Sequence, residues 1–162
     1  MKKYEALLVS LRKVIRAIDL YSKKLSKETG LTSPQLIVLQ NIAAHDGVMV
    51  KDIATCINLS SATVTSILDR LESRNFVIRE RSTVDKRKVG LHLTEQGKIA
   101  IKDSPTPLQH HFIERFEAME EWEQSQMLAT MERIAKMMDA DDIDAAPMLQ
   151  VGGIQVEDSE KH

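Results

Sequence analysis

One stretch of the sequence, residues 50–97, constrains the fold more than any other. It predicts two short helices joined by a tight turn and followed by a β-hairpin. The apolar residues of the first helix share one face: Ile53, Ala54 and Ile57. Residues 58–60 form the turn, and Ser60 or Ser61 caps the second helix, because a serine hydroxyl can accept a hydrogen bond from an orphan backbone N–H.

The second helix has two contrasting faces. Its apolar residues recur at helical spacing and are expected in the core: Val64, Ile67, Leu68 and Leu71. The opposite face carries short hydroxyls and one long cation: Ser61, Thr63, Thr65, Ser66 and Arg70. We expect these five side chains to contact DNA, because such a face can enter a major groove and reach phosphates and base edges. Asn75 is expected to end this helix, since asparagine tolerates the left-handed conformation.

The hairpin that follows has a basic tip. Residues 77–81 predict the outgoing strand, and apolar and polar side chains alternate over residues 88–93 on the return strand. Between the strands, Asp85 precedes three consecutive cations, Lys86, Arg87 and Lys88, which are expected to bind phosphate or the adjacent minor groove. A helix-turn-helix followed by a basic hairpin is a winged helix. The two halves in this order favour a DNA-binding protein.

These residues resemble the MarR family of bacterial transcription regulators. The matching pieces are Ile53-Ala54, Leu59-Ser60, Ser61-Ala62-Thr63-Val64-Thr65, Leu68-Asp69-Arg70-Leu71-Glu72, and Asp85-x-Arg87 leading to Leu93-Thr94-x-x-Gly97. The resemblance extends by element order over residues 5–138. It implies a triangular homodimer with a winged helix at two corners. It also implies that Arg87 is the wing arginine and that Asp85 stabilises the wing by orienting nearby arginines, while Asn75 stands where the family usually has glycine.

Helices are predicted on both sides of the winged helix. Residues 4–29 form a long amphipathic helix that ends at Gly30, and a second helix begins at Thr32-Ser33-Pro34. Further helices follow over residues 95–102, 108–116 and 120–138, and the prolines at 105 and 107 break the first from the second. The fold class is therefore mainly α with a small β-hairpin wing. A winged helix-turn-helix (31–97) joins a helical dimerisation region (1–30 and 98–138) in one MarR-type domain, 1–138.

The apolar faces of the first and last helices exceed what one small domain can cover. This excess favours a homodimer over packing within a single chain. The predicted dimer interface consists of Leu7, Leu11, Val14, Ile18, Trp122, Met131 and Ile134.

The net charge of −2 hides a strong asymmetry. Residues 1–50 carry eight Lys and Arg against four Asp and Glu, residues 51–98 nine against six, and residues 99–162 five against fourteen. The basic part can face phosphate while the acidic end points away. Residues 139–162 form an acidic C-terminal tail that we expect to be disordered. The alternative is that its short apolar run, residues 147–151, docks on the dimer.

No enzyme or metal motif is present, so we expect neither catalysis nor a metal or cofactor. His110 and His111 are adjacent, and on a helix they point about 100° apart, away from any single metal. Cys56 is expected to be a packed small hydrophobe, with a thiol redox sensor as the alternative. Three cations interrupt the apolar run near the N-terminus and no stretch has the length to cross a membrane, so a cytoplasmic protein without membrane contact is expected.

With these observations, the resemblance implies a homodimeric, ligand-responsive MarR-type repressor that binds a pseudopalindromic operator in double-stranded DNA. A small-molecule effector would bind between the dimer helices and the winged helix, where Tyr21, His45 and Met49 are candidates that packing or exposure explains equally well. The proline-rich break and the tail are similar to those of repressors of ectoine-type compatible-solute genes, which suggests osmotic-stress genes as targets. The alternatives are an architectural DNA-binding protein without sequence preference and the redox sensor through Cys56.

Overall fold

The structure is a computed structural model that describes residues 2–151. Within these residues it contains seven helices and one two-stranded antiparallel sheet, which confirms the predicted fold class. The elements are α1 (Lys3–Thr29), α2 (Ser33–Ala44), α3 (Val50–Ile57), α4 (Ser61–Ser73), β1 (Val77–Arg81), β2 (Val89–Leu93), α5 (Glu95–Asp103), α6 (Leu108–Glu117) and α7 (Glu121–Met137).

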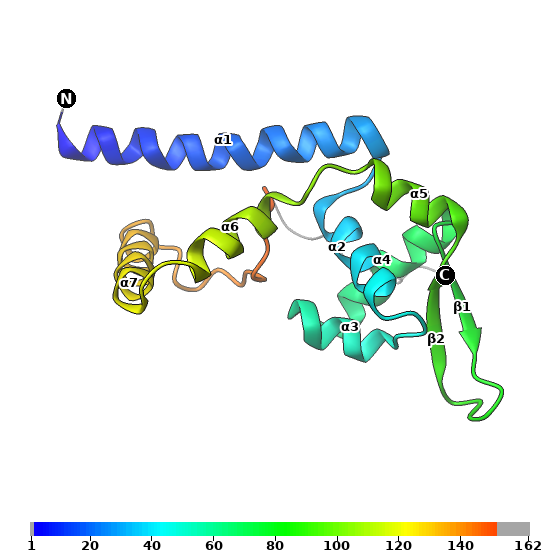
Figure 1. The fold of residues 1–162 in the computed structure, drawn as a ribbon. Coiled ribbons are helices and arrows are strands. Elements are labelled where there is room, and N and C mark those ends of the chain that lie inside the picture. Colours follow the sequence, from blue (N-terminus) through cyan, green and yellow to red (C-terminus); the bar gives the residue numbers. More distant parts are fainter. Residues whose placement is uncertain (1, 152–162) are drawn as a thin grey trace, which may run out of the picture.

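The elements gather in two groups along α1 (Figure 1). Helices α2 to α5 and the hairpin pack together at the C-terminal end of α1, whereas α6 and α7 lie beneath its N-terminal half. The buried core belongs to the first group and includes Leu36, Leu39 and Ile42 of α2. The predicted core residues of α4 are all buried: Val64, Ile67, Leu68 and Leu71.

A contact between the ends of α1 and α4 fixes the first helix to the winged helix. Gly30 ends α1 with a φ of 69°, a conformation that glycine adopts without strain. Arg74 donates a hydrogen bond of 2.6 Å to the Gly30 carbonyl, and its guanidinium lies 4.8 Å from the centre of the Phe76 ring. A Cβ at Gly30 would lie 2.8 Å from Arg74 Nη2, so a side chain there would push this arginine away.

The hairpin pairs Val77 with Leu93 and Arg81 with Val89 at its two ends. A third segment joins its inner edge, since Leu91 forms a bridge with Val48 from the turn after α2. The return strand runs directly into α5, and Thr94 accepts a hydrogen bond of 3.0 Å from the Gly97 N–H and donates one of 2.6 Å to the Asn75 carbonyl. The hairpin and α5 are therefore fastened to the C-terminal end of α4.

Gly97 occupies a position that admits no side chain. A Cβ there would overlap the carbonyl oxygen of Phe76, and the residue is buried. This contact gives a physical reason for the Leu93-Thr94-x-x-Gly97 pattern: Thr94 caps α5, and Gly97 lets the first turn of α5 approach the chain that leaves α4. Asn75 in that chain has a φ of 60°, the left-handed conformation that the sequence predicts.

The predicted tail, residues 139–162, lies only partly within the described part of the chain. Residues 139–151 return along α6, where two hydrogen bonds join Gln109 to the backbone of Pro147 and Leu149. None of the helices in residues 2–151 combines the length and the apolar character that crossing a bilayer requires.

Candidate nucleic-acid interface

Helices α3 and α4 form a helix-turn-helix whose turn is closed by its own side chains. Asn58 ends α3 in the left-handed conformation with a φ of 54°. Ser60 then caps α4, because its Oγ accepts a hydrogen bond of 3.1 Å from the Thr63 N–H. The Ser60 and Thr63 hydroxyls also lie 2.8 Å apart. Of the two caps that the sequence allows, the structure selects Ser60.

The five residues of α4 predicted to contact DNA differ in their surroundings. Ser61 and Thr65 are exposed, whereas Thr63, Ser66 and Arg70 are half-buried. The Thr63 hydroxyl is engaged at the cap, and Ser66 and Arg70 each take part in an interaction within the chain. Ser61 and Thr65 are therefore the side chains of this set that can meet a ligand with least change in the protein.

Arg79 of β1 neutralises the acidic side of α4. Its Nη2 lies 2.7 Å from Asp69 Oδ1, and its Nη1 lies 3.0 Å from Glu72 Oε2. Without this guanidinium, the two carboxylates of α4 would have no ion-pair partner among residues 2–151. The sequence reasoning did not single out Arg79. A signal exists, because Arg79 lies two residues after the buried Val77 and therefore on the same face of the strand.

The wing tip is a compact loop held by backbone and side-chain hydrogen bonds. The Ser82 N–H donates to the Lys88 carbonyl at 2.9 Å, and the Lys88 N–H donates to the Asp85 carbonyl at 2.9 Å. Ser82 Oγ accepts hydrogen bonds from the N–H groups of Val84 and Asp85. Asp85 Oδ1 accepts a hydrogen bond of 3.0 Å from the Arg87 N–H. Asp85 thus contacts the backbone of Arg87, while its predicted effect on arginine side chains remains a prediction.

The three cations of the wing tip project from this loop. Lys86, Arg87 and Lys88 are exposed, and none forms an ion pair with another residue of the described chain. Because a cation without a protein partner keeps its full charge for a phosphate, the tip is well suited to bind a polyanion. Val84, beside these cations, is 96% exposed.

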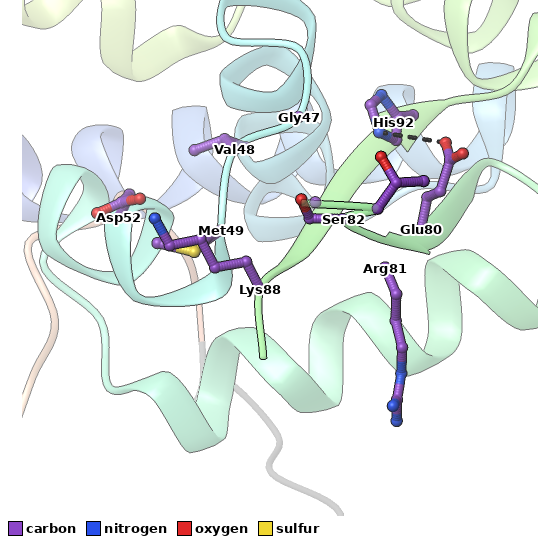
Figure 2. A pocket seen from close by; sticks show the side chains of 11 residues that line it. Gly47, Val48, Met49, Asp52, Glu80, Arg81, Ser82, Lys88 and His92 are labelled. Atoms are coloured by element: carbon purple, nitrogen blue, oxygen red, sulfur yellow. Dashed lines mark ion pairs between the residues drawn. The ribbon is translucent and has the colours of Figure 1, made fainter. Parts of the chain in front are cut away.

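A polar hollow of about 530 Å³ separates the start of α3 from the hairpin (Figure 2). His92 closes one side of it, with Nδ1 2.8 Å from Asp46 Oδ1 and Nε2 3.6 Å from Glu80 Oε2. Asp52 and Lys88 lie on the other side in the same view. These contacts join the turn after α2 to both strands, so they hold the wing against the rest of the winged helix. Within residues 2–151 no group of three or more acidic, histidine or cysteine side chains is arranged to hold a metal ion.

The three effector candidates do not come together. Met49 lines the polar hollow, His45 is exposed at the end of α2, and the Tyr21 hydroxyl donates a long hydrogen bond of 3.4 Å to the Pro105 carbonyl. Burial raises the pKa of Tyr21. Tyr21 therefore packs α1 against the break between α5 and α6.

The expectation of a packed Cys56 is wrong, because Cys56 is exposed. The short helix α3 turns Ile53 and Ala54 inward, and a residue two positions after Ala54 points to the opposite side. Exposure alone gives the thiol no reactive character.

Comparisons with known proteins agree with this geometry. Residues 31–89 match the MarR family. The chain is 40% identical over 78 residues to the HTH-type transcriptional regulator MgrA of Staphylococcus aureus, an alignment that covers 48% of this chain and 53% of MgrA. It is 30% identical over 95 residues to the HTH-type transcriptional repressor MdtR of Bacillus subtilis, covering 59% of this chain and 61% of MdtR.

The fold is also similar to that of solved structures. The crystal structure of YusO from Bacillus subtilis superimposes with a TM-score of 0.53 and 26% identity, covering 85% of this chain and 95% of YusO. By sequence the chain aligns with little more than half the length of MgrA and MdtR. The helix-turn-helix and the cations of the wing tip lie within residues 31–89, the segment that matches the MarR family.

Proposed function

We propose that this chain is a DNA-binding transcription regulator that acts as a homodimeric, ligand-responsive repressor on a pseudopalindromic operator. The observation that carries the proposal is the surface shared by α4 and the wing. Arg79 links α4, which carries exposed hydroxyls, to β1 of the hairpin. The tip of the same hairpin carries cations that form no ion pair within residues 2–151. Such a surface offers hydrogen-bonding groups for base edges and charge for phosphates.

In this proposal each element of the surface has its own task. Helix α4 enters the major groove, where Ser61 and Thr65 approach base edges first, and Thr63, Ser66 and Arg70 lie at the groove wall or beside phosphates. Lys86, Arg87 and Lys88 of the wing bind phosphates or reach into the adjacent minor groove. Asp85 holds the loop that carries them through its bond to the Arg87 N–H. The protein would act in the cytoplasm, where the DNA of a bacterial cell lies.

The homodimer is proposed from the apolar surface that a single chain leaves uncovered. Large apolar side chains are exposed on α1 and α7, among them Leu7, Ile15, Trp122, Leu128 and Met131. Such a surface exceeds what a monomer usually presents to water. The predicted interface residue Ile134 is only 7% exposed within one chain. It therefore packs under the exposed apolar side chains and adds little to the surface that a partner would cover. A symmetric dimer would place two α4 helices about 34–36 Å apart, one turn of DNA.

Repression is supported by the function of one relative, and ligand response by the hollows of the chain itself. MdtR, 30% identical over the aligned region, is named a transcriptional repressor. An effector that binds beside α1 and α6 could change the spacing of the two winged helices, which would lower operator affinity. The suggestion that the regulated genes serve compatible-solute metabolism stays a prediction from resemblance.

The alternative function is an architectural protein that binds DNA through charge alone. It needs the wing but not the hydroxyl face of α4, so its affinity would depend little on sequence. Selection of bound DNA from a random pool distinguishes the two. We expect an inverted repeat with half-sites one helical turn apart. A pool that stays random after several rounds, while still being retained by the protein, would contradict the proposal and support the architectural function.

A further inference from the structure

Arg74 connects the end of α4 to the end of α1. Its backbone completes α4, since its N–H donates a hydrogen bond of 3.2 Å to the Arg70 carbonyl. Its side chain reaches α1, where Nη1 donates a hydrogen bond of 2.6 Å to the Gly30 carbonyl and Nη2 donates a longer one of 3.4 Å to the Thr29 carbonyl. One residue therefore links the helix that we propose enters DNA to the helix that carries apolar surface for the homodimer.

The C-terminal end of α1 needs donors from outside the helix. The last carbonyls of an α-helix have no partner within the helix itself. The Gly30 N–H covers one of them with a hydrogen bond of 2.8 Å to the Ser26 carbonyl. Arg74 covers the carbonyls of Thr29 and Gly30, and its positive charge is favourable at this end of the helix dipole. A guanidinium suits the place, because its planar fork donates in two directions at once.

The surroundings of the Arg74 guanidinium restrict its position. The guanidinium lies 4.8 Å from the centre of the Phe76 ring, whose face attracts a cation. On the side of α1, a Cβ at Gly30 would lie only 2.8 Å from Arg74 Nη2, so the close approach depends on glycine. Arg74 is exposed, and hydrogen bonds at an exposed site add little to the stability of the whole fold. Their effect is on the direction in which α1 leaves the winged helix.

The joint between α1 and the winged helix is short. Among the described residues of α1, Leu25 alone is buried, and the Tyr21 hydroxyl makes a long contact of 3.4 Å with the Pro105 carbonyl. Both residues, like Thr29, lie in the last three turns of the helix. Helix α1 has 27 residues and is therefore about 40 Å long, so a rotation of about 10° at the joint moves its far end by about 7 Å. A small loss of restraint at Arg74 is amplified along this lever.

We propose that Arg74 is a positioning residue that sets the angle between α1 and α4, and with it the half-site spacing that the homodimer accepts. The proposal rests on the proposed homodimer and its pseudopalindromic operator, and it names a residue that determines which inverted repeats fit. Each base pair added between two half-sites moves one of them by about 3.4 Å and rotates it by about 35°. A dimer with a rigid joint follows one spacing, whereas a dimer with a loose joint follows several.

The test is titration of the full chain with three duplexes. They are the inverted repeat selected from a random pool, the same repeat with one base pair inserted at its centre, and a duplex with a single half-site. The affinity ratio of the first to the second measures spacing discrimination. We expect Arg74→Ala to lower this ratio about fivefold, the low end of what coupled sites show. Its affinity for the single half-site should equal that of the wild type, because the side chain acts on α1 and not on DNA.

Two variants are matched to this change. Arg74→Lys keeps the charge but not the fork, so its ratio should lie between those of the wild type and Arg74→Ala. Lys27→Ala removes one positive charge from the last turn of α1, at an exposed position, and should leave the ratio unchanged. Sedimentation and circular dichroism on the same samples verify that each variant is folded and dimeric.

Phe76→Leu gives a test that leaves the arginine in place. It removes the ring beside the guanidinium and keeps an apolar side chain against the core, so it should lower the ratio by less than Arg74→Ala does. Added to Arg74→Ala, it should have no further effect, because the ring then has no cation to hold. A further drop of the full size in the double variant would show that the two residues act independently and would contradict the proposal.

The outcomes separate this proposal from the proposed function. Equal spacing discrimination in the wild type, Arg74→Ala and Phe76→Leu would overturn the positioning role. So would an Arg74→Ala variant that binds all three duplexes more weakly to the same extent with a salt slope lower by about one unit, since that result marks a phosphate contact. A wild-type protein that does not prefer the inverted repeat to a scrambled duplex would instead overturn the proposed function.

Discussion

Arg79 of β1 bridges Asp69 and Glu72 of α4, with N–O distances of 2.7 and 3.0 Å. The two carboxylates are largely exposed, whereas the arginine side chain is 29% exposed. Exposed ion pairs of this kind contribute about 0–1 kcal/mol to stability. Their larger effect is on the surface potential, because the guanidinium offsets two negative charges on the helix that we propose enters DNA.

The first prediction compares the effect of Arg79 on stability with its effect on DNA binding. Arg79→Ala should lower the free energy of unfolding by less than about 1 kcal/mol. It should weaken operator binding by tenfold or more, about 1.4 kcal/mol, since the freed carboxylates repel phosphate. Denaturant unfolding and DNA titration measure the two quantities. Arg133→Ala removes the same charge from α7 and should change neither one, and equal operator affinities for all three proteins would exclude a role for Arg79.

The second prediction concerns the wing. Arg87→Ala should weaken binding to every DNA sequence and lower the salt slope of the affinity by about one unit, as for one lost phosphate contact. If Arg87 enters a narrow minor groove, the loss should be greater at A·T-rich flanks. Titrations at several salt concentrations measure the slope, with Lys102→Ala on α5 as the remote control. An unchanged affinity at every salt concentration would remove the wing tip from the mechanism.

The third prediction concerns Gly97. Glycine to alanine inside an exposed helix usually stabilises a protein by about 0.5–1 kcal/mol. Here the new Cβ would overlap the Phe76 carbonyl, so Gly97→Ala should destabilise the fold by about 1–3 kcal/mol. Lys102→Ala in the same helix should be nearly neutral in denaturant unfolding. A stabilised Gly97→Ala variant would show that α5 does not press against the end of α4.

The fourth prediction concerns assembly. Leu8 and Ile15 of α1 are exposed in a single chain, so replacing both with aspartate should leave the chain folded but yield a monomer. Lys24→Asp, at an exposed polar position of the same helix, should remain a dimer. Sedimentation at micromolar concentration separates the species, and circular dichroism checks the fold. A wild-type protein that sediments as a monomer would contradict the dimer proposal.

Local patterns in the sequence predicted most of the fold. The hydrophobic period located α4 and its buried residues, and proline and glycine marked the ends of α1 and α5. Asn75 was correctly placed in the left-handed conformation from its residue type alone. These features depend on neighbours in the chain, which is why a sequence reveals them.

Features that depend on tertiary distance were missed. The partners of Arg79 are set by how closely β1 approaches α4. The wrong expectation for Cys56 has the same origin, because the orientation of a short helix decides which small residue is covered. Periodicity over eight residues leaves that orientation open.

The most direct test of the central claim is a paired titration of Ser61→Ala/Thr65→Ala against the selected operator and a scrambled duplex at fixed salt. Both side chains are exposed, and the cap of α4 is Ser60, so within the described residues neither hydroxyl caps the helix. The account predicts a loss of about 1–3 kcal/mol on the operator, where base contacts are lost. It predicts almost no loss on the scrambled duplex, because no charge is removed. Equal losses on both duplexes would contradict sequence reading by α4.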